Sequence, residues 1–231
     1  MLLTFGHGTA SAEQMTELLR GAGVSALVDV RTAPGSRRHP HVARAELERW
    51  LPEAGISYRW DKRLGGFRRP GPDSPDVAWR EDMFRGYAEH MRTAGFSAAV
   101  DEVLAGASAE TTAVMCAESL WWRCHRRLLA DYVSAVRGVP VRHLLHDGRL
   151  EDHRLSPGLR LRDDGLLVYD AGQSPLLLKW RRPLRPGRRG SRRSARWRRR
   201  GRSRTPRSRP GSRPSRGRPG PWRRPRWHRR R

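Results

Sequence analysis

The chain has 231 residues and a formal net charge of +25, from 48 lysines and arginines against 23 acidic residues. Half of the basic residues are the 24 arginines that follow Trp180, in a segment without lysine or acid, so the 24 others nearly balance the acids. Residues 1–180 are therefore close to neutral. This excludes a domain in that part of the chain that binds nucleic acid through a large positive net charge. A chain of this length suits one domain with a sizeable core.

The cysteine count and the first residues indicate the compartment. Two cysteines are too few for a disulfide scaffold, and the start MLLTFGHGT lacks the basic region and long apolar run of a secretory signal. Apolar runs also stay well short of the roughly 18 residues that span a bilayer. We therefore expect a soluble, cytoplasmic protein with free thiols and no membrane contact.

Short apolar runs alternate with helical patterns along the chain. Ser11, with Gln14 three positions later, is a capping box that starts the first helix, and Gly23 ends it. In chain order we expect strands at residues 2–5, 26–30, 56–60, 112–115 and 139–145, helices at 11–22, 43–54, 77–91, 96–104 and from about 120, and a hairpin at 159–170. Strands that alternate with helices predict an α/β fold with a mainly parallel sheet and helices on both faces, a Rossmann-like three-layer arrangement.

The arginine-rich end of the chain differs in composition from the rest. We expect an α/β domain at residues 1–170, a linker at 171–180 and a disordered tail at 181–231, because arginine, proline, glycine and serine bury too little apolar surface to offset the ordering entropy. One interpretation is a nucleic-acid-binding arm in which Trp197, Trp222 and Trp227 stack on bases. The other is an out-of-frame translation of GC-rich DNA, which the restricted set of residue types favours.

Polar side chains gather after several of the predicted strands. Parallel strands end at one edge of a sheet, where α/β proteins place their ligands. GHGT follows the first strand, DVRTAPGSRR ends the second, Gly65-Gly66 lies in a later loop and CAES ends the central strand. We expect one pocket that holds Gly6, His7, Asp29, Arg31, Arg37, Cys116 and Glu118. Alternatively, Asp29 and Arg31 only pair with each other at a strand end.

The segment TTAVMCAESLWWRCHRR, residues 111–127, carries both cysteines. On a helix that begins near Leu120, Cys124 and His125 point inward in the first turn, where the helix dipole lowers a thiol pKa. Another stripe holds Arg123, Arg127 and Asp131, and its arginines are predicted to face solvent.

Several chemistries fit these residues. Cys116 could act as a nucleophile with His125 as its base and Glu118 as orienting group or general acid, or both cysteines could simply fill core positions. No cofactor is expected. A zinc site is disfavoured because Cys124 and His125 would project about 100° apart on a helix, and a resting disulfide with Cys116 is disfavoured in the cytosol.

A phosphate site is the remaining chemistry. The spacing of a cysteine phosphatase is absent, because six residues and no glycine separate Cys116 from Arg123. Phosphate could instead bind Arg31, Arg37 and Arg38 beside Gly35 and Ser36, since guanidinium groups match phosphate oxygens.

These motifs resemble the uncharacterised prokaryotic family catalogued as domain of unknown function 488. The resemblance rests on GHGT, LVDVRTAPGSRR, FRGYAEHM and above all MCAES-x-x-x-RCHR, and it covers about residues 1–170. It implies an α/β domain with a shared polar site at Cys116, Glu118, Cys124, His125 and Arg126, and it implies no activity. Two features depart from the family: Gly8 stands where serine is usual, and the arginine tail has no counterpart.

We predict an enzyme that acts on a phosphate-bearing or nucleotide-like substrate. Arg31, Arg37 and Arg126 would bind the anion, Cys116 or Glu118 would do the chemistry, and His125 would move protons. The alternative is a non-catalytic module that senses a nucleotide or an oxidant through the same pocket.

Overall fold

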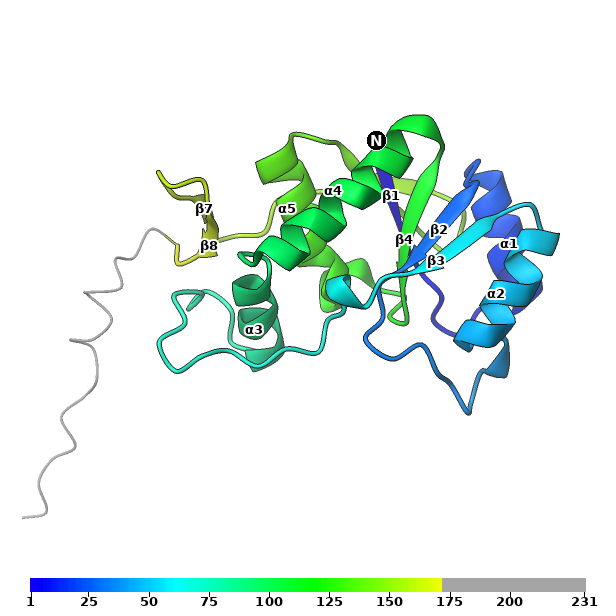
Figure 1. Ribbon diagram of the computed structural model, residues 1–231, viewed down its shortest axis with the longest axis horizontal. Helices are drawn as coiled ribbons and strands as arrows, with labels where there is room; N and C mark the ends of the chain where they lie inside the picture. Colours follow the sequence, from blue (N-terminus) through cyan, green and yellow to red (C-terminus); the bar gives the residue numbers. More distant parts are fainter. Residues whose placement is uncertain (172–231) are drawn as a thin grey trace, which may run out of the picture. The chain divides into compact units, whose positions relative to one another are not determined.

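The structure is a computed structural model that describes residues 1–171 (Figure 1). Its central sheet has six strands in the order β3-β2-β4-β1-β5-β6. Pairs from β3 to β5 are parallel and β6 is antiparallel to β5, so the expected mainly parallel sheet is confirmed. The strands are β1 (Leu2–Gly6), β2 (Ala26–Asp29), β3 (Ser57–Trp60), β4 (Thr112–Cys116), β5 (Val141–Leu144) and β6 (Leu150–Asp152).

Helices cover both faces of this sheet, which confirms the predicted three-layer α/β fold. One face carries α1 (Ala12–Gly21) and α2 (Arg44–Glu53), and the other carries α3 (Asp82–His90), α4 (Ala94–Ala109) and α5 (Arg126–Arg137) (Figure 1). Short 3-10 helices are η1 (Pro40–Val42), η2 (Lys62–Leu64) and η3 (Trp121–Arg123). Because β4 lies between β1 and β2, the strand order differs from the 3-2-1-4-5-6 of dinucleotide-binding domains.

The alternation of side chains along β1 and β4 divides the core into two clusters. Leu3 and Phe5 pack in the cluster that contains Met15 and Leu19 of α1. Leu2 and the strand-end residue Cys116 belong instead to the cluster formed with α3, α4 and α5. Each fully buried large apolar side chain stabilises the fold by about 1.5–3 kcal/mol. The packing therefore directs the Cys116 thiol toward the face that α5 covers.

Several local predictions are confirmed. The backbone N–H of Gln14 donates to Oγ of Ser11 at 3.3 Å, and the N–H of Ser11 donates to Oε1 of Gln14 at 2.9 Å, which completes the capping box. The hairpin near the end of the domain consists of β7 (Leu159–Leu161) and β8 (Leu167–Tyr169), which pair antiparallel.

Other boundaries were predicted wrongly. The helix expected at residues 77–91 begins only at Asp82, and the residues before it form a turn in which the N–H of Ala78 donates to the carbonyl of Tyr169 at 2.8 Å. The helix expected from about Leu120 begins at Arg126, after η3. Strand β6 was not predicted, since its three residues carry two acids and follow no apolar alternation.

Within residues 1–171, no helix has the length and apolar character that crossing a membrane requires. The predicted linker beyond Ala171 and the arginine-rich tail lie outside the described residues. Their disorder, their two interpretations and the boundary at residue 170 therefore stay predictions.

Candidate functional site

Three neighbouring parallel strands end at the same edge of the sheet. Gly6 of β1 is the register partner of Cys116 of β4, and Asp29 of β2 is the partner of Met115. The polar segments that follow these strands therefore start side by side although they are far apart in the chain. The site described below is built from the segment after β4 and from the start of α5.

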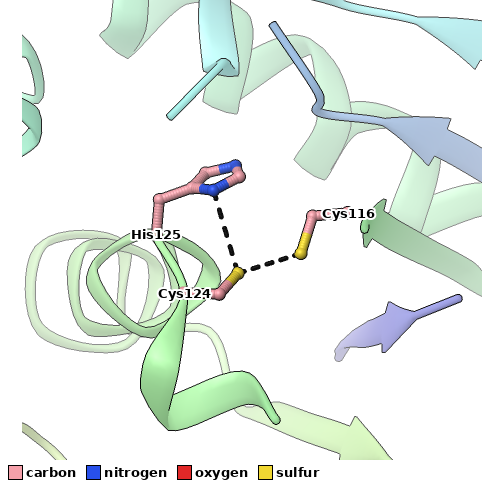
Figure 2. A group of neighbouring side chains, drawn as sticks. All are labelled: Cys116, Cys124 and His125. Carbon is pink, nitrogen blue, oxygen red and sulfur yellow. Dashed lines mark hydrogen bonds between the residues drawn. The ribbon is translucent and has the colours of Figure 1, made fainter. Parts of the chain in front are cut away.

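The two cysteines face each other at this edge (Figure 2). Cys116 is the last residue of β4, and its Sγ lies 2.9 Å from Sγ of Cys124, while both thiols are free. Cys124 follows η3 in an extended conformation, with φ −137° and ψ 160°. The prediction that it lies on a helix is therefore wrong. This extended residue is what turns its side chain back toward β4.

Arg126 is the cation of the site and the first residue of α5. It is only 1% exposed, and its Nε donates to Sγ of Cys116 at 3.0 Å. One terminal nitrogen donates to the carbonyls of Glu118 and Ser119, and the other lies 3.5 Å from Oγ1 of Thr4. We expected Arg126 to bind an anionic substrate, but its donors are directed at the thiol and at the protein's own oxygen atoms.

The hydrogen bond between the two sulfur atoms couples their protonation. Burial alone would raise the pKa of Cys124, but the hydrogen bond from the Cys116 thiol and the Arg126 charge together lower it from 9.0 to about 6. Burial and the bond to Cys124 raise the pKa of Cys116 well above 9.0. Two thiolates this close would repel each other strongly, so one sulfur ionises while the other holds its proton. At neutral pH the pair carries one negative charge, which Arg126 balances.

His125, which precedes α5, is oriented by a backbone carbonyl. Its Nε2 lies 3.1 Å from the carbonyl oxygen of Val30, and its Nδ1 lies 3.8 Å from Sγ of Cys124 (Figure 2). Burial is the main cause that lowers the pKa of His125. A neutral imidazole that donates from Nε2 presents the lone pair of Nδ1 to the thiol. The ring also packs on Gly66, where a Cβ atom would lie 2.5 Å from Nδ1, so the Gly65-Gly66 loop must approach closely.

Glu118 acts on the site through its backbone. Its N–H donates to Sγ of Cys116 at 3.3 Å, and its carbonyl accepts from Arg126. Its side chain is exposed and accepts from the N–H of Leu120 at 3.4 Å. The contacts of Glu118 with the thiols and with Arg126 are therefore made by its backbone, and the carboxylate with the predicted catalytic role contacts neither thiol.

A cavity of about 270 Å³ opens above the thiols. Cys116, Cys124 and His125 line it together with Arg31, Thr32 and Gly66, and Glu118 and Arg123 contribute charged groups. Its lining also includes Phe67 and Met83, which are 73% and 37% exposed. Exposed apolar side chains next to buried thiols favour a ligand with an apolar group.

Asp29 and Arg31 form a closed ion pair. The guanidinium of Arg31 donates to Asp29 with contacts down to 2.5 Å and to the carbonyl of Val42 at 2.8 Å. Asp29 also accepts from the hydroxyl of Tyr58 at 2.9 Å. Arg31 thus lines the cavity with its charge already balanced, as the alternative interpretation of this pair stated.

The other predicted ligand-binding residues do not line this cavity. Oγ of Ser36 accepts from the N–H of His39 at 2.9 Å, and Arg37 is exposed and does not line the cavity. His7 is buried near Arg31, and its burial first and that neighbouring charge second lower its pKa to about 4. Gly6 serves packing instead, because a Cβ atom there would collide with the carbonyl of Glu118 and with Arg126.

The stripe predicted to carry Asp131 on the outer face of the helix is also corrected. Arg123 is exposed as expected, but Arg127 is half-buried against Trp79 and donates to Oγ of Ser156 at 2.7 Å. Asp131 is fully buried. The helix starts later than predicted and packs under β8, so the angular assignment made from Leu120 does not apply.

Thr4 and two histidines near it, His143 and His153, were not predicted from the sequence. Thr4 is fully buried, and its Oγ1 lies 2.6 Å from Nδ1 of His143. Its signal was a single polar residue within the apolar run LLTFG. Phe67 was also missed, because a loop residue gives no sign of the cavity that it borders.

A metal ion could be held by Cys116, Cys124 and His125, whose ligand atoms lie within 4.8 Å of one another. The 100° separation expected of Cys124 and His125 on a helix does not apply, because Cys124 is not helical. The Arg126 guanidinium contacts Cys116 at 3.0 Å and would repel a cation. The arrangement fits a thiolate balanced by an arginine better than a thiolate balanced by a metal.

Fold and site together define a three-layer α/β protein with two thiols, a histidine and an arginine at the carboxyl edge of its sheet. The chain belongs to the family described as Domain of unknown function DUF488, whose sequence model matches residues 11–133. The resemblance read from the motifs is thus confirmed over a segment that includes both cysteines. No curated protein and no protein of known structure matches the chain.

Proposed function

We propose that the chain is an enzyme of dithiol–disulfide chemistry in which Cys124 is the nucleophile and Cys116 the second, resolving thiol. The observation that carries the proposal is the 2.9 Å separation of two free sulfur atoms at the base of an open cavity. A lowered pKa of the Cys124 thiol, to about 6, supplies a nucleophile at neutral pH. The substrate class is a small disulfide with an apolar group.

The reaction proceeds in two balanced displacements. The Cys124 thiolate attacks one sulfur of the substrate disulfide, which breaks the S–S bond, releases a thiolate that takes a proton from water, and leaves a mixed disulfide. Cys116 then gives its proton to water and attacks Sγ of Cys124, which releases the second half of the substrate as a thiolate that takes up a proton. The protein becomes a disulfide and the substrate becomes two thiols. A low-molecular-weight thiol returns the protein to its reduced state by the reverse steps.

Arg126 supports both displacements from one position. While Cys124 is ionised, the guanidinium balances the negative charge of the pair. Once Cys124 is in the mixed disulfide, it no longer repels a charge on Cys116, and Nε of Arg126 at 3.0 Å stabilises the thiolate that forms there. The lone pair on Nδ1 of His125 accepts a proton from the Cys124 thiol when that thiol is neutral.

The predicted phosphate-bearing or nucleotide-like substrate stays a prediction with weaker support. Of its three arginines, Arg31 is paired with Asp29 and Arg126 with the thiols and carbonyls. Arg37 lies outside the cavity lining. A phosphate in this cavity would therefore find the charges of Arg31 and Arg126 already balanced, which leaves the exposed Arg123 among the guanidinium groups of the described lining. The redox-sensing interpretation differs from the enzyme proposal only in whether the disulfide forms repeatedly.

The test uses dipyridyl disulfide, a small uncharged disulfide with aromatic groups, and the intact mass of the protein. Wild-type protein should lose the mass of two hydrogen atoms and retain no adduct, because Cys116 resolves the mixed disulfide. Cys116→Ser should accumulate one adduct, and peptide mapping should place it on Cys124. Cys124→Ser should react more slowly, because burial, the largest cause, still raises the pKa of the remaining Cys116 thiol.

Two results would contradict this assignment. One is a wild-type protein that keeps both thiols under conditions in which a free small thiol exchanges completely. The other is equal adduct formation in the two single variants, which would remove the distinction between nucleophile and resolving thiol. Turnover with an added low-molecular-weight thiol, absent in the double variant, separates an enzyme from a sensor that reacts once.

A further inference from the structure

A buried chain of polar side chains runs from the site to the far side of α5. Oγ1 of Thr4 lies 2.6 Å from Nδ1 of His143, and Nε2 of His143 lies 3.0 Å from Nδ1 of His153. Nε2 of His153 in turn lies 3.0 Å from Oδ1 of Asp131. The side chains of His143, His153 and Asp131 are at most 1% exposed. None of them has a role in the dithiol chemistry proposed above.

The direction of the hydrogen bonds between these side chains depends on the tautomers of the two histidines. Asp131 also accepts from the N–H of Ser156 at 2.9 Å and from the hydroxyl of Tyr169 at 2.8 Å. When Nε2 of His153 donates to Asp131 and its Nδ1 accepts from His143, the Thr4 hydroxyl donates to Nδ1 of His143. With the opposite tautomer of His143, Oγ1 of Thr4 accepts instead. In both arrangements the Thr4 oxygen keeps a lone pair for Arg126.

Arg126 connects this row of hydrogen-bonded side chains to the thiols. Its NH1 lies 3.5 Å from Oγ1 of Thr4, the longest link, while its Nε contacts Cys116. Burial first, then His153 and the Arg126 charge, lower the pKa of His143 to about 3, so this imidazole stays neutral. A guanidinium does not release its proton in proteins, so the chain cannot deliver protons to the thiols. What it can transmit is orientation and polarisation.

A second connection reaches the segment between the cysteines. Trp121 of η3 stacks on His143 with ring centroids 3.9 Å apart and an angle of 6° between the planes. Its indole N–H donates to Glu151 at 3.3 Å. The residue that stacks on His143 therefore lies three positions before Cys124 and five after Cys116.

We infer that His143, acting through Thr4 and through Trp121, is a positioning residue that holds Arg126 and the segment between the cysteines and so sets the reactivity of Cys124. This inference deepens the proposed function, because it concerns control of the same thiols. It requires that Cys124 ionises, and it does not require that a disulfide cycle follows. The other titratable groups around Cys124 are Cys116 of β4, His125 before α5 and Tyr87 of α3, whose pKa burial raises.

The first test replaces the Thr4 hydroxyl by a methyl group. Thr4→Val should raise the pH midpoint of iodoacetamide alkylation at Cys124 by about one unit, which lowers the rate below the midpoint by about tenfold. Thr112→Val is the matched control, because Thr112 is also buried in a strand but donates only to the carbonyl of Glu110 at 3.3 Å. The control should keep the wild-type midpoint.

The second test separates the two connections at His143. His143→Phe keeps an aromatic partner for Trp121 and removes both hydrogen bonds, whereas His143→Asn keeps an acceptor for Thr4 and removes the ring. Each variant should raise the alkylation midpoint, and Thr4→Val should add little in the His143→Phe background, because the two residues act in one chain. Circular dichroism and thermal unfolding identify variants that are folded at the temperature of the assay.

The outcomes distinguish this inference from the proposed function. A wild-type midpoint near pH 6 that stays unchanged in folded Thr4→Val and in both His143 variants overturns the inference and leaves dithiol chemistry intact. Midpoints that shift as expected, in a protein that forms no disulfide with the small disulfide, overturn the dithiol cycle and support the positioning role. A wild-type protein without a midpoint below pH 8 overturns both.

Discussion

Nε of Arg126 lies 3.0 Å from Sγ of Cys116, and this contact joins the first residue of α5 to the last residue of β4. The same guanidinium donates to the carbonyls of Glu118 and Ser119. It therefore holds the loop after β4 in place and also balances the negative charge of the thiols. A planar fork with five donors can do this, whereas an ammonium group cannot. The Arg126 side chain is thus the feature on which the geometry of both thiols depends.

Arg126→Lys should therefore raise the alkylation midpoint of Cys124 by about one unit or more and destabilise the fold by about 3 kcal/mol. The matched control is Arg92→Lys, because Arg92 also donates as a fork, to Asp76 at 2.7 and 3.1 Å, away from the thiols. That control should lose stability without any change in the midpoint. Equal midpoints in the two variants would show that the charge alone matters.

Gly6→Ala should destabilise the fold by displacing the Glu118 carbonyl and the Arg126 guanidinium. The added Cβ would overlap the carbonyl of Glu118 and the guanidinium of Arg126, and overpacking of this kind costs about 1–3 kcal/mol. Gly21→Ala in α1 is the control, since nothing lies within 4 Å of its added Cβ, and it should stabilise the helix by about 0.5–1 kcal/mol. Urea unfolding measures both, and equal effects would contradict the close approach at Gly6.

Stability should rise with pH between 6.5 and 8.5. Because the pKa of Cys124 falls from 9.0 to about 6 on folding, the unfolded chain binds more protons in this window, and the stabilisation is lost as pH decreases toward 6. The expected gain is roughly 2 kcal/mol over the window. Above pH 9 the raised pKa of Cys116 acts in the opposite sense.

Part of the rise near pH 6.5 belongs to the buried histidines. Folding lowers the pKa values of His7 and His143 from 6.5 to about 4 and about 3, so the unfolded chain binds more protons at these residues up to about pH 7.5. Urea unfolding of Cys124→Ser at the same two pH values is the comparison, and the part of the gain that only the wild type shows belongs to Cys124. A wild-type slope that persists in Cys124→Ser would assign it to another group.

Phe67→Ser should slow the reaction of the thiols with an aromatic disulfide severalfold and leave thermal stability unchanged. Phe67 is 73% exposed and borders the cavity, so the side chain is available to a ligand but adds little to the core. Leu155→Ser is the control, because Leu155 is 51% exposed and does not line that cavity. The rate with dipyridyl disulfide measures the effect, and equal rates in both variants would remove Phe67 from the binding surface.

Part of the site followed from sequence because it depends on local order. Cys116 ends a buried strand, and the rule that parallel strands share a carboxyl edge brought it close to the ends of β1 and β2. The sequence does not say which acceptors a guanidinium meets, so the contacts of Arg126 with Cys116 and with two backbone carbonyls could not be predicted, and its expected role as an anion ligand stays a prediction. The stripe containing Asp131 failed for a similar reason, since the helix start was misplaced by about six residues.

The sequence by itself determined the α/β class, the mainly parallel sheet and the segment that carries the thiols, because capping residues and the period of apolar side chains act over a few positions. Tertiary structure alone decided that β4 lies between β1 and β2, that the two sulfur atoms approach to 2.9 Å and that Arg126 contacts Cys116. These contacts join residues that are far apart in the chain. They form only when the strands pair and α5 packs on the sheet, and no local pattern records that pairing.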